Sequence, residues 1–217
     1  LDGFEKELPE YMHLAYLPTP GLIRLRLTGA CEDESLLSAN MDKFSAKLYE
    51  LVGDKIICDE DMPLAQILGK KLLEKGMTVA SAESCTGGNI AHEITRIAGS
   101  SSYFKGSVVS YANEVKINVL NVSSADIDVH GVVSEPVVQQ MVSGVCKVMN
   151  TDCAISTSGI AGPGGAEPGK PVGTVWIAAK AADNVVSQCF HFPGDRERVI
   201  NRATNEGIKM LLKLLND

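Results

Sequence analysis

The sequence lacks several features that would each point to a particular class of protein. No apolar stretch among its 217 residues approaches the roughly 20 residues that a membrane-spanning helix needs. Lysine and arginine form no run or stripe, and the formal net charge is −7. These absences argue against a membrane-spanning protein, and against a general binder of nucleic acids or anionic membranes.

Cysteine and histidine are present, but neither is clustered. The six cysteines form no CxxC pair and no zinc-like spacing, and the four histidines are isolated. Several cysteines lie inside apolar runs, which is typical of reduced core cysteines. The first ten residues are acidic and polar, unlike a signal peptide. We therefore expect a cytoplasmic protein with no metal site and no cofactor.

The chain changes character near residue 60, which predicts two domains, 1–60 and 61–217. In the first domain, two short strand-like runs flank a predicted turn, Pro18-Thr19-Pro20-Gly21. Apolar residues three and four apart then predict a helix from Leu37 to Leu51, and Lys55–Cys58 predicts a further short strand. Together these elements predict a small α+β module.

The second domain alternates between helix and strand patterns. Helices are predicted at Leu64–Lys75, Gly88–Ala98, Asn113–Leu120, after an N-cap at Ser134, and at Arg196–Leu215. Strands are predicted at Met77–Ser81, Lys105–Tyr111 and Asp152–Ser158, with an antiparallel hairpin made of Val172–Ala179 and Val185–Phe192. This alternation predicts an α/β fold, a three-layer α/β/α sandwich whose sheet is mixed because of the hairpin.

The first candidate site is the stretch Ala80–Gly88, in which a predicted strand leads through Glu83 into the turn Ser84-Cys85-Thr86-Gly87-Gly88 at the start of a predicted helix. Ligands of open α/β sheets gather at such places, and main-chain N–H groups there suit an oxyanion or a phosphate. The turn matches neither a Walker loop nor GxSxG, so a helix-capping turn of small residues is the alternative. Ser84 is the predicted nucleophile, and Cys85 competes with it because a thiol is intrinsically more nucleophilic.

The second candidate site is Ser110–Lys116. Tyr111 ends a predicted strand and Asn113 is a predicted N-cap, which places Lys116 about three residues into the next helix. The helix dipole there disfavours an ammonium, and burial would lower the pKa of this lysine further, towards the neutral amine of a general base. A solvent-exposed lysine is the alternative. The pattern predicts a proton path of serine, lysine and tyrosine without histidine.

The third candidate site is the stretch Ser156–Gly165, where hydroxyl side chains end a buried strand and a glycine-rich loop follows. This pattern predicts a ligand cradle, or else a flexible connection. Arg196 opens the last predicted helix, where its side chain could reach a phosphate. An ordinary surface charge at a helix start is the alternative.

Six segments of the second domain occur in an order that resembles one known family. They are Ala-Glu-Ser-Cys-Thr-Gly-Gly, Ala-Gly-Ser-Ser-Ser-Tyr-Phe, Ser-Tyr-Ala-Asn-Glu-Val-Lys, His-Gly-Val-Val-Ser-Glu, Ser-Gly-Ile-Ala-Gly-Pro-Gly-Gly and Lys-Pro-Val-Gly-Thr-Val-Trp. From about Pro63 onward, the chain resembles the C-terminal domain of the competence/damage-inducible CinA family, the nicotinamide-nucleotide amidohydrolases (NMN deamidases). Before it, Leu-Ala-Tyr-Leu-Pro-Thr-Pro-Gly and Arg-Leu-Arg-Leu-Thr-Gly resemble the KH-like middle domain of full-length CinA.

The resemblance implies hydrolysis of the carboxamide of nicotinamide mononucleotide to nicotinate mononucleotide and ammonia. It implies catalytic roles for Ser84, Tyr111 and Lys116, with no metal and no cofactor. The residues that it implies as substrate contacts are Thr86, Gly87, Gly88, Asn113, Gly159, Ile160, Ala161, Gly162 and Arg196. It also implies a homodimer or larger homo-oligomer, and a molybdopterin-binding-like domain ahead of this chain in the full-length protein.

Two other functions stay open. A CinA-type domain that is catalytically silent could act as a regulatory or protein-interaction subunit, although intact Ser84, Tyr111 and Lys116 weigh against it. The KH-like module could bind single-stranded nucleic acid. Against this, residues 1–61 contain no GxxG loop, and Arg24 and Arg26 are their only basic cluster.

Overall fold

The computed structural model describes residues 1–19 and 22–216, which form two compact units, Leu1–Asp61 and Met62–Asp217. The elements of the first unit are the helix α1 (Asp2–Glu5), the strands β1 (Met12–Thr19) and β2 (Leu22–Gly29), the helix α2 (Glu34–Val52) and the 3₁₀ helix η1 (Gly53–Lys55). The two strands pair antiparallel. Asp33 caps α2, because its carboxylate accepts a hydrogen bond from the Leu36 amide at 3.0 Å.

The core of the first unit is small and includes an aromatic pair. Phe4 of α1 meets Phe44 of α2 edge to face, with ring centroids 6.0 Å apart. Met12 and Leu14 of β1 are buried against them. The unit is therefore a hairpin covered by helices, an α+β arrangement as predicted, and its resemblance to a KH domain stays a prediction.

The predicted strand at Lys55–Cys58 is wrong. Lys55 ends η1, and residues 56–58 belong to no strand. The Ile56 amide instead donates to the Gly53 carbonyl at 3.1 Å, a local turn bond that replaces a bond to another strand. The predicted turn at 18–21 also differs, because β1 includes Pro18 and Thr19, and residues 20 and 21 lie outside the described residues.

The second unit is built on one sheet of five strands, in the order β4-β3-β5-β6-β7. These strands are β3 (Val79–Glu83), β4 (Phe104–Val109), β5 (Cys153–Gly159), β6 (Thr174–Ala181) and β7 (Asn184–His191). β3 pairs parallel with β4 and with β5, whereas β5, β6 and β7 pair antiparallel. The predicted mixed sheet is confirmed, because β6, the first strand of the β6–β7 hairpin, runs opposite to the other four strands.

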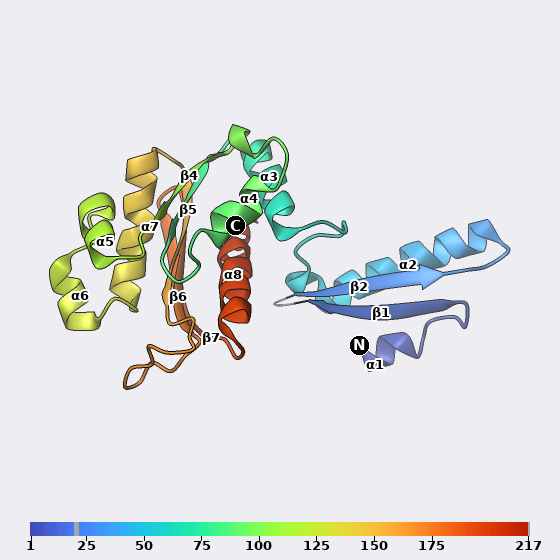
Figure 1. Ribbon diagram of the computed structural model, residues 1–217. Helices are drawn as coiled ribbons and strands as arrows, with labels where there is room; N and C mark the ends of the chain where they lie inside the picture. Colours follow the sequence, from blue (N-terminus) through green and yellow to red (C-terminus); the bar gives the residue numbers. More distant parts are fainter. Residues whose placement is uncertain (20–21, 217) are drawn as a thin grey trace. The chain divides into compact units, whose positions relative to one another are not determined.

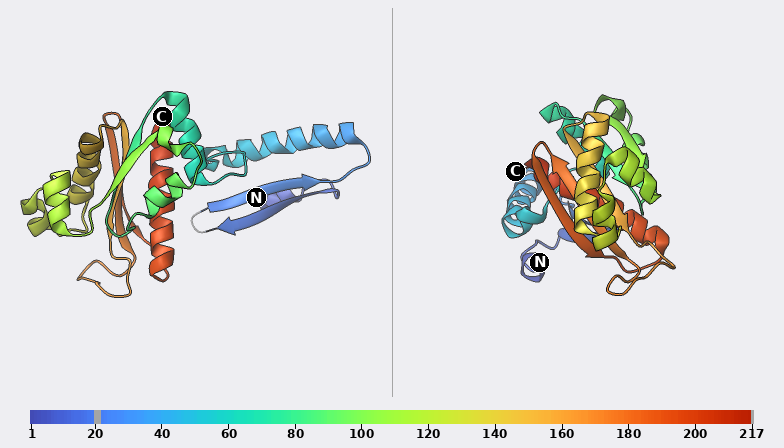
Figure 2. Two further views of the ribbon diagram at one scale, coloured as in Figure 1. Left: turned by 45° about the horizontal axis from the view of Figure 1, so that its top comes forward. Right: turned by 90° about the vertical axis from the view of Figure 1, so that its left-hand side faces the viewer.

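Helices cover both faces of this sheet, which completes the predicted three-layer sandwich (Figures 1 and 2). One face carries α7 (Glu135–Met149), with α5 (Asn113–Leu120) and α6 (Ser124–His130) beside it, and the other carries α3 (Leu64–Lys75), α4 (Asn89–Thr95) and α8 (Arg196–Asn216). A short 3₁₀ helix, η2 (Ser100–Ser102), precedes β4. Among the described residues, no helix has both the length and the apolar character to cross a membrane.

The helix α6 had not been predicted. It has seven residues and none of them is buried, so it lacks the apolar stripe by which the longer helices are recognised in a sequence. In contrast, α7 and α8 bury apolar stripes that include Val138, Met141, Val199 and Leu211. These two helices pack against opposite faces of the sheet, and each contributes buried residues to one core cluster of this unit.

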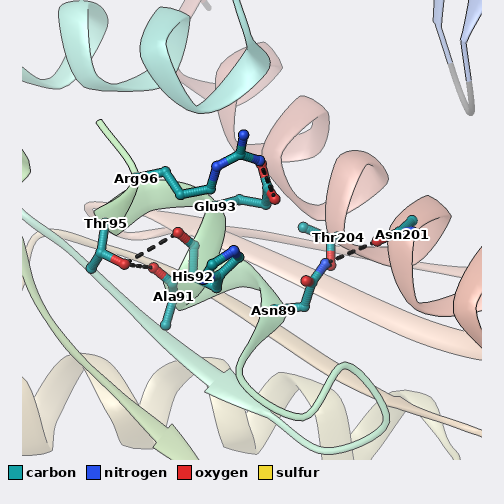
Figure 3. Close-up of polar contacts among 8 residues, drawn as sticks. All are labelled: Asn89, Ala91, His92, Glu93, Thr95, Arg96, Asn201 and Thr204. Carbon is teal, nitrogen blue, oxygen red and sulfur yellow. Dashed lines mark hydrogen bonds and ion pairs between the residues drawn. The ribbon is translucent and has the colours of Figure 1, made fainter. Parts of the chain in front are cut away.

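The short helix α4 is held against α8 by a polar contact (Figure 3). The Asn89 side-chain amide donates to Thr204 Oγ1 at 2.9 Å and to Asn201 Oδ1 at 3.4 Å. Because α4 follows the Ser84 turn directly, this contact fixes the helix that the turn leads into.

Candidate active site

The carboxyl ends of three neighbouring strands bring the three predicted segments together. Ser84 follows β3, Ser110 follows β4, and Gly159 ends β5. The Ser84 amide donates to the Thr157 carbonyl at 3.0 Å, and Ser110 Oγ donates to the Glu83 carbonyl at 3.5 Å. This edge is where ligands of open α/β sheets bind, so the contacts define one candidate site.

Lys116 is buried at this edge, with 1% of its surface exposed. Its Nζ donates to the main-chain oxygens of Ser110 at 2.6 Å and of Tyr111 at 3.4 Å. Burial lowers the pKa of Lys116 below its ordinary value of 10.5, an effect partly opposed by nearby Cys85. A neutral amine has two N–H groups and one lone pair, so two carbonyls can occupy the N–H groups and leave the lone pair for a proton. The alternative of an exposed lysine is wrong.

The environment of Cys85 differs from that of Ser84. The Cys85 side chain is 6% exposed and packs in an apolar cluster with Ala161, Val175 and Ile177. Burial raises the pKa of this thiol to about 12, so it holds its proton at neutral pH. Ser84 is half-buried, and no described residue forms a hydrogen bond with its hydroxyl. The geometry therefore favours Ser84 as the nucleophile.

Tyr111 and Arg196 form a second contact network at the site. The Tyr111 side chain is 61% exposed, and its hydroxyl accepts a hydrogen bond from Arg196 Nη2 at 2.9 Å. Arg196 Nη1 donates to the Gly162 carbonyl at 2.9 Å. Lys116 therefore contacts the carbonyl of Tyr111, whereas the hydroxyl of Tyr111 contacts Arg196. Asn113 is the exposed first residue of α5, and the N-cap is the residue before it, one position earlier than predicted.

Glu83, at the end of β3, is fully buried and immediately precedes Ser84. Its Oε1 accepts hydrogen bonds from Ser81 Oγ at 3.0 Å, Ser107 Oγ at 3.3 Å and the Ala91 amide at 2.9 Å. Its Oε2 accepts from Thr86 Oγ1 at 2.8 Å and from the Gly88 and Ile90 amides, each at 3.0 Å. A buried carboxylate needs such compensation, because an unpaired charge in the interior is strongly unfavourable.

Glu83 lies in the first candidate site, but the sequence patterns above predict no role for it, although one signal is available. Glu83 is the only charged residue in the otherwise small-residue strand Val79–Glu83, and a glycine-rich turn follows it. An acidic residue in a buried strand must find several donors, and a tight turn offers free amides. That reasoning would have singled out Glu83 without a structure.

The Glu83 network changes the predicted substrate contacts of the turn. The Gly88 amide and the Thr86 hydroxyl both donate to Glu83, and Thr86 Oγ1 also lies 2.8 Å from Thr157 Oγ1. The Gly87 amide donates to the Ser84 carbonyl at 3.1 Å. These groups had been predicted to face a ligand, and the correction is that all three are engaged within the protein.

The Ser156–Gly165 segment also differs from its prediction. The hydroxyls of Ser156 and Ser158 donate to main-chain carbonyls of residues 138 and 132, at 2.7 and 2.8 Å. The Ile160 amide and carbonyl both pair with residues 173 and 174, and the side chains of Ile160 and Ala161 are buried. The predicted cradle is therefore largely a structural junction. It contacts the rest of the site through Thr157, which meets Ser84 and Thr86, and through the Gly162 carbonyl, which accepts from Arg196.

Two further observations concern the metal-ligating residue types. All six cysteines are free thiols. Among the side chains that the structure describes, no three His, Cys, Asp or Glu residues are grouped in a way that could hold a metal ion. The side chains that could take part in proton transfer at the candidate site are those of Glu83, Cys85, Tyr111 and Lys116, and Arg196 contacts Tyr111.

Comparison with known proteins gives one consistent family. Residues 61–215 match the model of the CinA C-terminal domain. A CinA-like protein of Flavobacterium psychrophilum is 44% identical over 214 residues, covering 98% of this chain and 51% of that protein. One from Salinibacter ruber is 44% identical over 189 residues, covering 87% of this chain and 46% of that protein. The chain spans about half the length of these curated relatives.

Solved structures of similar proteins share the α/β fold. The competence damage-inducible protein A (ComA) of Klebsiella pneumoniae superposes with a TM-score of 0.69 at 37% identity, over 70% of this chain and 95% of that chain. The competence/damage inducible protein CihA of Agrobacterium tumefaciens superposes with a TM-score of 0.68 at 35% identity, over 71% of this chain and 94% of that chain.

Proposed function

This chain belongs to the CinA C-terminal domain family, and we propose that its second unit hydrolyses the carboxamide of nicotinamide mononucleotide to nicotinate mononucleotide and ammonia. The observation that carries the proposal is the buried Lys116 amine at the strand edge that also presents Ser84. A serine beside a lysine of lowered pKa is a nucleophile with its general base. The family resemblance, and not the geometry, supplies the nucleotide amide as the substrate.

In the first half of the reaction, the neutral Lys116 amine takes the proton of Ser84 Oγ as this oxygen attacks the carboxamide carbon. The electron pair of the C=O double bond moves to the carbonyl oxygen, which becomes an oxyanion. When the tetrahedral intermediate collapses, the Lys116 ammonium returns its proton to the leaving nitrogen. Ammonia departs and a nicotinoyl ester remains on Ser84.

In the second half, water attacks the ester carbon and Lys116 takes a proton from that water. Collapse releases the carboxylic acid, which then ionises to the carboxylate, and Lys116 returns its proton to Ser84 Oγ. The reaction therefore consumes one water and releases one ammonia for each amide. Tyr111 connects the proposed base to Arg196, because its carbonyl accepts a hydrogen bond from Lys116 and its exposed hydroxyl accepts one from Arg196. We assign Arg196 to the phosphate, because its guanidinium is held in place by two neutral oxygens.

Substitution of the two neighbouring residues tests the nucleophile. Ser84→Ala should reduce ammonia release from nicotinamide mononucleotide by about 10³-fold or more, since the covalent step is lost. Binding of the nucleotide, measured by calorimetry, should change little. Cys85→Ala is the matched control, and it should keep the wild-type turnover because the thiol is buried and protonated.

Two outcomes would refute this assignment. If Cys85→Ala loses turnover while Ser84→Ala keeps it, the thiol is the nucleophile. If the wild-type protein binds the nucleotide and releases no ammonia, the alternative of a catalytically silent regulatory or protein-interaction domain is favoured.

A further inference from the structure

The main-chain amides around Ser84 divide into two groups. Eight amides run from Ser84 to Ala91, and six of them have acceptors in the protein. Three of the six donate to Glu83, and the other three donate to carbonyls of the same turn or of β5. Of these eight amides, those of Cys85 and Thr86 are the two with no oxygen acceptor among the described residues, and the Cys85 amide contacts only the thiol of its own side chain.

The two remaining amides belong to residues that are themselves buried, with Cys85 6% and Thr86 3% exposed. Buried amides without an acceptor are rare, and each one requires an explanation. Both follow Ser84 directly, in the turn that holds it. An acceptor that arrives only during the reaction, such as the oxyanion formed when Ser84 attacks, would explain both.

We propose that Glu83 is the positioning residue of this active site, and that the turn it fixes leaves the Cys85 and Thr86 amides to receive the oxyanion of the amide hydrolysis proposed above. Glu83 acts through the backbone and does not touch the substrate. Its carboxylate binds the amides of Gly88, Ile90 and Ala91, which lie on the far side of the turn from Ser84 in sequence. The turn is thereby closed around a single side chain.

The geometry explains why a carboxylate is needed and an amide would not serve. Each Glu83 oxygen accepts at least one main-chain N–H, Oε1 from Ala91 and Oε2 from Gly88 and Ile90. In Glu83→Gln, the side-chain NH₂ must occupy one of these two positions whichever way the amide is turned. It would then face a main-chain donor that cannot rotate away, and that contact would open the turn.

The first experiment compares Glu83→Gln with the control Ser156→Ala. This control also removes a buried hydrogen bond from a strand, but that bond joins β5 to the Val138 carbonyl of α7 and does not involve the turn. Hydrogen exchange of residues 84–91 should accelerate in Glu83→Gln and stay at the wild-type rate in Ser156→Ala. Thr86→Val removes one hydroxyl donor from Glu83, keeps the carboxylate, and should accelerate exchange to a smaller extent. If Glu83→Gln does not fold, the exchange rates of Thr86→Val test the positioning role of Glu83 instead. Wild-type exchange in both Glu83→Gln and Thr86→Val would overturn the positioning role.

The kinetic signature separates positioning from a general loss of folded protein. With rates corrected for the folded fraction, kcat of Glu83→Gln should fall about 10²-fold, the effect of a misplaced oxyanion donor, with KM within about twofold. Ser156→Ala should keep both constants. A rise in KM at unchanged kcat would mean that Glu83 shapes substrate binding, and would overturn the proposal.

The second experiment tests the two amides with 3-pyridineboronic acid, which forms a tetrahedral adduct on an activated serine. In ¹H–¹⁵N spectra, the Cys85 and Thr86 resonances should shift on adduct formation and those of Gly87 and Gly88 should stay. The reverse pattern would overturn the assignment of the oxyanion site. If no adduct forms on Ser84, the proposed hydrolysis fails instead, and the exchange measurements still decide the role of Glu83.

Discussion

Replacing Lys116 with methionine would reveal the charge of the buried amine through the pH dependence of stability. Burial lowers the pKa of Lys116 in the folded protein, whereas the unfolded chain has the ordinary value of 10.5. Between these two pKa values, the unfolded state binds more protons than the folded state. The free energy of unfolding therefore rises with pH across this window. Methionine does not titrate, so Lys116→Met should lack this rise.

The magnitude has two parts. One proton gives a slope of at most about 1.4 kcal/mol per pH unit, reached only where the unfolded amine is charged and the folded amine is neutral. Independently of pH, methionine leaves the Ser110 carbonyl without the donor that lies 2.6 Å away in the wild type. An unpaired buried carbonyl costs about 1–3 kcal/mol. At high pH the wild type should therefore be the more stable protein, and at lower pH its buried ammonium should reduce that advantage.

Urea denaturation of both proteins from about pH 6 to pH 10 measures the difference directly, because all other titrating groups are shared. Lys105→Met, at an exposed position of β4, is the matched control and should follow the wild-type curve. A difference between wild type and Lys116→Met that is flat or falls with pH would refute the reasoning. It would show that Lys116 stays an ammonium in the fold, and a permanent ammonium cannot act as the base.

Three other predictions concern binding and packing. Arg196→Gln should raise KM about tenfold for nicotinamide mononucleotide but leave that for the riboside nearly unchanged, because only the nucleotide has a phosphate. Arg202→Gln, on the same helix, is the control, and equal effects on both substrates would contradict a phosphate contact. Tyr103→Phe should stabilise the protein by about 1 kcal/mol in urea melts, since the buried Tyr103 hydroxyl has no partner among the described residues; a loss of stability would reveal a bond to this hydroxyl. Gly144→Ala should lower the free energy of unfolding by about 2 kcal/mol despite its better helix propensity, because a Cβ there would lie 2.1 Å from the Leu120 carbonyl. A melting temperature at or above the wild-type value would show that α5 and α7 can move apart.

Much of the architecture can be read from local patterns. The helix Leu64–Lys75 is confirmed at both ends, because Gly76 stops it in a left-handed conformation with φ of 64°. The β6–β7 hairpin is confirmed from two apolar runs and a short polar turn between them. Both depend on residues close together in the chain, so the sequence was sufficient to predict them. The placement of Ser84 after a strand and of Lys116 in the first turns of a helix was predicted in the same way, since strand-to-helix junctions are visible as changes of period; their catalytic roles stay predictions.

Other features depend on which residues come into contact in the folded protein, so local sequence patterns either did not predict them or predicted them wrongly. Lys55–Cys58 has the composition of a strand, but a strand also needs a neighbour to pair with. Ser84 and Cys85 are adjacent in the chain, and only packing shows that the thiol enters the α8 side of the core while the hydroxyl stays half-buried. Sequence reasoning left these two assignments open for that reason.

Glu83 shows most clearly the difference between what the sequence determines and what only the tertiary structure determines. Its position before the turn is a property of the chain, whereas its six donors come from β3, β4, the turn and α4. The turn is predicted to offer its amides to a ligand, whereas in the fold three of the eight amides from Ser84 to Ala91 donate to this carboxylate and three more donate to main-chain carbonyls. The local sequence determines which hydrogen-bond donors the turn contains. The tertiary structure determines which acceptor they bind, because a carboxylate that is buried away from water must be paired with the donors that the surrounding elements bring near it.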